Sequence, residues 1–396
     1  MQPRRMVADI GGTNTRIALF DPEASKLRAV RTYINRDYLQ LEDVIARWLA
    51  DLDEPAPTAC CIAVAAPLSS DRVTMVNMDW SFSRSDIIRR FGMQQAGWVN
   101  DFQANAHALP HLSGEERRLL HPGRDGATGK LAVVGPGTGL GGATLEWAAG
   151  FPHACPCEPG HMGLAFATPE DRELFRRLAP SDGESYAELL VSGPGLQRLY
   201  RGLGEVRDQQ TDSALSPEEI SGRALRAEDT LCTASLETFC ALLGSVCGDF
   251  VLANGAYGGV YLAGGIVPRM MDFLENSAFH RRLTHKGALA EPLGDVPVHV
   301  VTAPHPGLLG AAHAPLQAGH SPLTRHAWVV VRFEPAVGRD SRQPVLNRLL
   351  SAHLMAGETL PSAQHGRRPA QGESSEQHRV FRESIADCST TDSVDP

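Results

Sequence analysis

The sequence predicts a soluble α/β protein made of two lobes, and three observations support this prediction. The chain is 396 residues long, which is more than a single hydrophobic core usually organises. Strand-like runs come first and then alternate with helical ones, as is typical of α/β folds. A glycine-rich turn between two apolar runs occurs near residue 12 and again near residue 138, which indicates a weak internal duplication.

The first lobe is expected over residues 1–110. Apolar, β-branched runs predict its strands, and apolar residues at helical spacing predict a helix over 41–52. Ser85 and Asp86 are typical of the start of a second helix. The expected strands lie at 7–10, 15–21, 27–36, 60–66 and 97–99, and a further helix is expected at 102–109.

The second lobe is expected over residues 111–299. It would open with a hairpin at 131–147 and continue through helices at 170–178, 184–203, 217–225 and 233–254 to strands at 258–265 and 296–302. A helix at 306–312 would return to the first lobe, so residues 300–319 are assigned there. Residues 320–396 are expected to be a largely disordered C-terminal extension, although 327–355 could hold a strand and a helix.

Composition limits the classes of function. With 42% hydrophobic and 21% charged residues, the chain has the balance of a soluble protein, and its net charge of −9 argues against a nucleic-acid partner. No run approaches the roughly 18 apolar residues of a membrane span, and the N-terminus lacks the apolar stretch of a signal peptide. The eight cysteines do not resemble a disulfide framework, so we expect reduced thiols, a cytoplasmic location and no membrane partner.

The first glycine turn, with the sequence DIGGTN over residues 9–14, is a candidate phosphate site. Glycines allow backbone N–H groups to approach a ligand, and an acidic residue beside them can face a hydrated divalent cation. The alternative is an ordinary hairpin, since glycine turns between strands are common.

The second glycine turn matches the dinucleotide-binding spacing at Gly137, Gly139 and Gly142. That motif requires a helix directly after the glycines, whereas GGATLEW favours a strand. The sequence therefore predicts a second hairpin whose amides could bind phosphate.

Asn100 and Asp101 follow a strand, at the end where α/β sheets usually bind ligands. A carboxylate there could accept a proton from an attacking hydroxyl, with Asn100 holding a neighbouring hydroxyl. Asp101 could instead cap the next helix.

The turn from Glu158 to His161 carries two polar groups suited to sugar hydroxyls. Zinc is the rival ligand there, because Cys155 and Cys157 are close, but a C-x-C pair lacks the usual zinc spacing. Glu188 is predicted on a helix end, where a solvated role is equally open, and the pair Gly264–Gly265 could admit an adenine ring or merely end a strand.

Taken in order, these motifs resemble those of bacterial glucokinases of the non-ROK type, in the superfamily of actin, hexokinase and heat-shock proteins. The resemblance runs from about Val7 to Ala318 and includes the segments DIGGTNTRIAL, VNDFQANAHALP, GPGTGLGGA, EPGHMGLAF, ELLVSGPGLQRLY, GVYLAGGI and PGLLGAA. It implies a two-lobed ribonuclease H-like fold with a cleft between the lobes.

The resemblance also implies a reaction, the ATP-dependent phosphorylation of D-glucose at its 6-hydroxyl. Asp101 would be the catalytic base, and magnesium would be held mainly through the ATP phosphates rather than by a protein metal site. A homodimer is expected, and a kinase for another hexose or amino sugar, or a non-catalytic sugar sensor, stays open. The sugar ligands would be Asn100, Asp101, Glu158, His161 and Glu188, and the nucleotide ligands Asp9, Ile10, Gly11, Gly12, Thr13, Asn14, Gly137, Thr138, Gly139, Gly264 and Gly265.

Overall fold

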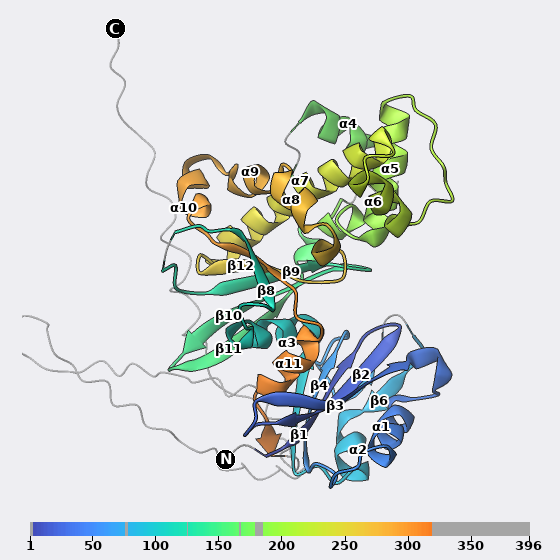
Figure 1. The fold of residues 1–396 in the computed structure, drawn as a ribbon, viewed down its shortest axis with the longest axis vertical. Helices are drawn as coiled ribbons and strands as arrows, with labels where there is room; N and C mark the ends of the chain where they lie inside the picture. The colour runs from blue at the N-terminus through green and yellow to red at the C-terminus, as the bar shows by residue number, and fades with distance from the viewer. Residues whose placement is uncertain (1–2, 76–77, 125, 166–167, 179–184, 319–396) are drawn as a thin grey trace, which may run out of the picture. The chain divides into compact units, whose positions relative to one another are not determined.

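The computed structural model describes residues 3–75, 78–124, 126–165, 168–178 and 185–318. All of these belong to one compact unit, which is shown as a ribbon in Figure 1. The expected disordered extension over 320–396, with its possible strand and helix, lies outside the described residues.

The first sheet has six strands in the order β14-β7-β4-β1-β2-β3. Its first three strands in sequence form an antiparallel meander, β4 and β7 continue the sheet in parallel from β1, and β14 closes it antiparallel to β7. The strands are β1 (Arg5–Ile10), β2 (Asn14–Asp21), β3 (Lys26–Ile34), β4 (Ala59–Val64), β7 (Gln95–Asn100) and β14 (Gln317–Ala318).

The second sheet repeats this pattern in the order β11-β10-β9-β12-β13-β8. An antiparallel meander of β9, β10 and β11 is again followed by two parallel strands and one antiparallel edge strand. The predicted duplication of the glycine-turn hairpin therefore extends to a whole sheet. The strands are β8 (Arg117–His121), β9 (Leu131–Pro136), β10 (Leu140–Ala148), β11 (Phe151–Cys157), β12 (Gly259–Leu262) and β13 (Val298–Val301).

Two helices and a small hairpin accompany the first sheet. α1 (Leu41–Ala50) buries Leu41, Val44, Ile45 and Trp48, the residues that helical spacing placed on one face. α2 (Arg84–Arg90) has its N-cap at Ser83, two residues before the predicted Ser85, and the Ser83 side chain accepts the Asp86 N–H. The hairpin consists of β5 (Arg72–Thr74) and β6 (Ser81–Ser83).

Most helices cover the second sheet, around the long buried helix α7 (Thr230–Asn254). In the described part of the chain, α7 alone is long and apolar enough to cross a membrane, which the sequence prediction overlooked. Most of its apolar stretch is buried, as in the core helix of a soluble protein. The others are α4 (Pro169–Leu178), α5 (Gly193–Val206), α6 (Pro217–Leu225), α8 (Met271–Asn276), α9 (Phe279–Thr284) and α10 (Ala290–Gly294). Short 3-10 turns occur along the whole described chain: η1 (Asn35–Asp37) after β3 of the first sheet, then η2 (Leu109–His111), η3 (Pro159–His161), η4 (Ala187–Leu189), η5 (Val267–Arg269) and η6 (Gly287–Leu289).

Two helices join the sheets. α3 (Asp101–Ala108) packs on β9, β10 and β11, and α11 (Pro306–His313) packs on β1 and β4. The two helices also pack on each other, as Figure 1 shows. Gly310 of α11 has no side chain, and a Cβ there would overlap the carbonyl of Ala104. This missing side chain lets the backbones of α3 and α11 approach closely.

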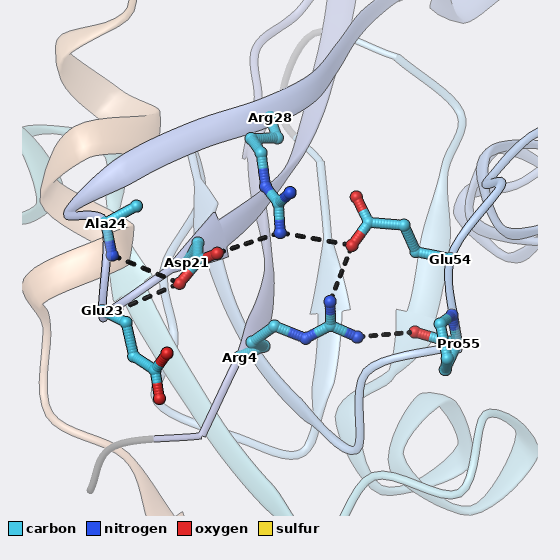
Figure 2. A network of polar contacts seen from close by, with 7 residues as sticks. All are labelled: Arg4, Asp21, Glu23, Ala24, Arg28, Glu54 and Pro55. Atoms are coloured by element: carbon cyan, nitrogen blue, oxygen red, sulfur yellow. Dashed lines mark hydrogen bonds and ion pairs between the residues drawn. The ribbon is translucent and has the colours of Figure 1, made fainter.

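A polar network fixes the end of the first sheet that lies away from the glycine turn (Figure 2). The Oε2 atom of Glu54 accepts from Arg4 at 2.6 Å and from Arg28 at 3.2 Å, and Arg28 also donates to Asp21 at 2.9 Å. The network ties the start of β1 to the β2–β3 turn and to the loop after α1. Because these side chains are partly exposed, each pair contributes only about 0–1 kcal/mol.

Candidate active site

The first glycine turn is held by a residue from outside it, Asn35 of η1. The Asn35 side chain donates to the Gly11 carbonyl and accepts the Thr15 hydroxyl, both at 2.8 Å, while its backbone N–H donates to the Thr13 carbonyl at 2.9 Å. Within the turn, the Gly11 N–H donates to the Asn14 carbonyl. Gly12 and Thr13 are exposed, so the tip of the turn is open to a ligand while its base is fixed.

Asp9 is a partly exposed residue near the end of β1, separated from this turn by the buried Ile10. Its carboxylate lies 3.6 Å from the Arg16 guanidinium and against Gly307, where an added Cβ would be 2.8 Å from the Asp9 carboxylate carbon. Burial raises the pKa of the Asp9 carboxyl, and Arg16 and His305 oppose this shift only in part. The positive charges near Asp9 therefore do not fully offset the effect of burial on its carboxylate.

Asn100 and Asp101 stand at the junction of β7 and α3. The Asn100 side chain caps α3 by accepting the Phe102 N–H at 2.9 Å and the Gln103 N–H at 3.3 Å. In return, the Gln103 side chain accepts the Asn100 N–H, and the two contacts form a capping box. The capping role that the sequence allowed for Asp101 therefore belongs to Asn100, and one Asp101 carboxylate oxygen remains free of the cap.

The environment of Asp101 raises its pKa to about 6. Burial is the main cause, and the negative charges of Asp9 and Glu158 add to it, whereas the Phe102 N–H acts in the opposite direction. Asp9 comes from the first sheet and Glu158 follows the second, so both lobes act on this one carboxyl.

Phe102, the residue after Asp101, anchors α3 on the second sheet. Its ring lies over Gly135 and Gly141, which face each other in β9 and β10. A Cβ at Gly135 would lie 2.8 Å from the ring, and one at Gly141 would overlap it. These two glycines thus form a floor for the ring, because a side chain at either position would take up the space that the ring occupies.

The second glycine turn is braced from two sides. Gly137 donates to the Gly139 carbonyl at 2.7 Å, and its own carbonyl accepts from Gly193, the first residue of α5, at 2.8 Å. Gly264, with a φ of +82°, approaches so closely that a Cβ would lie 2.5 Å from the Pro136 carbonyl oxygen. The Gly264–Gly265 turn is therefore adjacent to this second glycine turn, and Thr138 at its tip is exposed.

Glu188 joins the second glycine turn to the turn at Glu158. Its Oε2 atom accepts the Leu140 N–H at 2.8 Å, and a Cβ at Gly160 would lie 3.2 Å from the same oxygen. Glu188 lies in η4 rather than on the predicted helix over 184–203, because Ser192 caps a new helix, α5, that starts at Gly193. Glu158 and His161 are exposed, and the His161 ring stacks on Tyr186 with centroids 5.3 Å apart.

The structure thus forms two groups of predicted site residues. The charges of Asp9 and Glu158 act on Asp101, and Glu188 connects the second glycine turn to the Glu158 turn. The sequence analysis missed the supporting residues Asn35, Phe102, Gln103 and Tyr186. Of these, only Gln103 carried a readable signal, because Asn-x-x-Gln before a helix is a capping-box pattern.

The fold first defines the class of protein. Two sheets of the same pattern, each with a glycine turn, form the fold of sugar kinases in the actin and hexokinase superfamily. A glucokinase from Balamuthia mandrillaris, solved with glucose, shares this fold at 20% identity, with a TM-score of 0.64 over 78% of this chain and 92% of that one. A ROK-family glucokinase from Streptomyces griseus, solved with glucose and AMPPNP, does so at 19% identity, with a TM-score of 0.53 over 78% and 98%.

Closer matches define the family. The glucokinase family model matches residues 6–318. A glucokinase from Caulobacter sp. (strain K31) is 38% identical over 81% of this chain and 97% of its own length, and one from Aromatoleum aromaticum is 40% identical over 78% and 94%. The crystal structure of a glucokinase from an Antarctic psychrotroph matches with 35% identity and a TM-score of 0.72 over 79% of this chain and 98% of that one. The chain belongs to the glucokinase family, and the predicted family and fold are confirmed.

Proposed function

We propose that the chain transfers the γ-phosphoryl group of ATP to the 6-hydroxyl of D-glucose, with Asp101 as the base. The observation that carries this proposal is the Asp101 carboxyl, which lies between groups from both lobes and has a pKa raised to about 6. A carboxylate with a pKa near neutrality is better suited to take a proton from a hydroxyl than one of ordinary acidity. Phosphoryl transfer otherwise requires positioning and charge stabilisation more than covalent help from the protein.

The sugar would be held around Asp101. Asn100 accepts the cap hydrogen bonds through its Oδ1 atom, which leaves its amide N–H groups to donate to a sugar hydroxyl. Glu158 and His161 are exposed on a turn stiffened by Pro159, and we assign them to further hydroxyls. Glu188 has one oxygen engaged by Leu140, so we assign its other oxygen to the sugar.

The phosphates would be held by the two glycine turns. We assign Asp9, Ile10, Gly11, Gly12, Thr13 and Asn14 to one side, and Gly137, Thr138 and Gly139 to the other, with Gly264 and Gly265 beside the adenosine. The braced bases and exposed tips of both turns support this, since fixed backbone N–H groups suit phosphate oxygens.

Magnesium fits this arrangement through Asp9. Its carboxylate is partly buried, its pKa is raised, and the Arg16 guanidinium lies 3.6 Å away. Magnesium is usually bound by one or two carboxylates together with substrate phosphates. When bound, it would neutralise charge on the phosphates, while Asp9 would hold it on the protein side.

The test is the Asp101→Asn variant, assayed by glucose-dependent ADP release and by calorimetric titration with glucose. We expect kcat to fall by about 10³-fold or more, and glucose binding to stay within about threefold of wild type. Near-normal turnover would overturn the assignment of the base. Wild-type protein that binds glucose without releasing ADP would instead favour a sugar sensor. A panel of mannose, fructose and glucosamine, compared by kcat/KM, would show whether another hexose or amino sugar is preferred.

We further propose a cytoplasmic homodimer in which residues 1–110 with 300–319 form the small domain and 111–299 the large one. The seven described cysteines are all free thiols, as is usual in a reducing compartment. Light scattering in solution would measure the oligomeric state.

A further inference from the structure

Two cysteines lie beside the proposed sugar turn and take no part in the proposed reaction. Cys155 and Cys157 are partly exposed on β11, whereas the other five described cysteines are buried. β11 is an edge strand of the second sheet, so one side of it has no neighbouring strand. These two thiols are therefore the accessible ones among the described cysteines.

The strand directs both thiols to the same face. Side chains alternate along a strand, so Cys155 and Cys157 share a face and Pro156 points the other way. The Cys157 thiol leans back along the strand and donates to the Cys155 carbonyl, with its sulfur 3.5 Å from that oxygen. Across the sheet, Cys157 is paired with Gly142, and the Pro159 ring occupies the place where a Gly142 side chain would lie.

The same geometry limits what the pair can bind. Residues two apart on a strand are separated by about 6.6 Å, whereas a disulfide requires Cβ atoms about 3.5–4.5 Å apart. An S–S bond would therefore require the strand to bend. A structural zinc ion needs four ligands, and no group of three or more His, Cys, Asp or Glu residues in the described part of the chain could hold a metal ion. An acceptor atom that bonds to both sulfurs holds them further apart than an S–S bond does, so it requires less bending of the strand.

We propose that Cys155 and Cys157 form a two-sulfur site for soft, thiophilic acceptors of the trivalent organoarsenical class. In the reaction with an arsenic(III) oxide, two As–S bonds form and the arsenic–oxygen bond breaks. The two thiol protons leave with that oxygen as one molecule of water. Arsenic stays trivalent, so neither an oxidant nor a reductant is needed.

The surroundings favour two-sulfur capture over attack by a single thiol. Burial and the neighbouring Cys155 raise the pKa of the Cys157 thiol, so little of it is thiolate at neutral pH. Alkylating reagents require a thiolate, and Cys157 is expected to react slowly with them. Lys130, which pairs with Glu146 at 2.9 Å, interacts electrostatically with the Cys157 sulfur and favours loss of its proton.

Occupancy of this site should disturb sugar binding, a consequence that rests on the proposed function. Cys157 is followed directly by Glu158, and the Pro159 ring packs against Gly142, where a Cβ would lie 2.6 Å from the ring. Drawing the two sulfurs together moves the strand end that carries this turn. Glu158 and His161 would then lose their positions toward the sugar.

The experiment uses the full chain with Cys388→Ser, because Cys388 lies outside the described residues. Phenylarsine oxide is added, and intact mass is measured before and after treatment with a dithiol or a monothiol. We expect one adduct, removed by the dithiol only, and absent from Cys155→Ser and from Cys157→Ser. No adduct, or an adduct that persists in both variants, would overturn the proposal.

A second readout tests the link to the sugar. The adduct should raise the KM for glucose by about tenfold, and glucose should slow its formation. An adduct that leaves both glucose binding and turnover unchanged would overturn the coupling to the sugar turn. The mass measurement does not depend on activity, so failure of the proposed reaction and failure of the dithiol site remain distinguishable.

Discussion

Replacing Gly141 with alanine tests whether the Phe102 ring fixes the position of Asp101. An added Cβ at Gly141 would overlap two atoms of this ring, Cδ2 and Cε2. The other edge of the ring already lies against Gly135 of the same floor, where an added Cβ would be 2.8 Å from it. The ring cannot slide along the sheet, so α3 must move away, and Asp101 moves with it.

The expected cost follows from that lack of room. Overpacking a close-packed site costs about 1–3 kcal/mol, and we expect about 2–3 kcal/mol here because the ring lies in contact with both glycines of the floor. The catalytic effect should be larger than the loss of stability implies. A displacement of about 1 Å at a reacting group can lower the rate by about 10²-fold, so kcat/KM should fall by that order.

Urea unfolding and steady-state kinetics measure the two effects, and two further variants control them. Gly294→Ala adds a methyl group where no atom lies within 4 Å and should be near neutral. In a Phe102→Ala background, Gly141→Ala should cost less than about 0.5 kcal/mol, since the overlap is gone. If the costs of Gly141→Ala and Phe102→Ala instead add within about 0.5 kcal/mol, the ring does not position α3, and the reasoning is refuted.

Three other predictions concern charge and hydrogen bonding. The stability that Asp101 contributes is present below about pH 4 and is lost as the pH rises through its folded pKa of about 6. Asp101→Asn should therefore raise the free energy of unfolding at pH 7 by about 2 kcal/mol. An unchanged urea midpoint would contradict this. Burial lowers the pKa values of His107 and His313 to about 4, so the free energy of unfolding should fall as the pH drops from 6.5 toward 4. His107→Gln should make that fall less steep. An equally steep fall in this variant would show that the histidines are not its source. Asn35→Ala leaves the Gly11 carbonyl without its side-chain partner and should raise the KM for ATP by about tenfold, whereas an effect on the KM for glucose alone would argue against a role in the phosphate turn.

Local patterns predicted most of the described elements, because they depend on neighbours in the sequence. Alternation and helical spacing gave the hairpins at 11–14 and 137–139 and the buried face of α1. The misplaced helix around Glu188 also had a local cause, since Ser192 followed by glycine and proline is a helix-start pattern that was overlooked.

The supporting contacts of the candidate site could not be predicted in this way. Asn35 reaches Gly11 only because β3 folds back along β2. The positions of Asn35 and Gly11 in the sequence give no sign of this contact. The floor beneath Phe102 depends on which residues of β9 and β10 face each other. It therefore depends on the register of these two strands. The raised pKa of Asp101 likewise arises from residues that only the folded chain brings together.

The way α11 completes the first sheet has a consequence for synthesis of the chain. The second sheet is built from the continuous segment 117–301, whereas the first needs α11 and β14, which come last among the described elements. Arg5, near the start of β1, donates to the Ala314 carbonyl at 3.0 Å. On the ribosome, α1 and α2 can cover one face of the first sheet early, whereas its other face stays uncovered until residues 306–318 are made. We therefore expect the sheet of the later-made lobe to be complete before that of the first lobe, and this face of the first sheet to be exposed longest during synthesis.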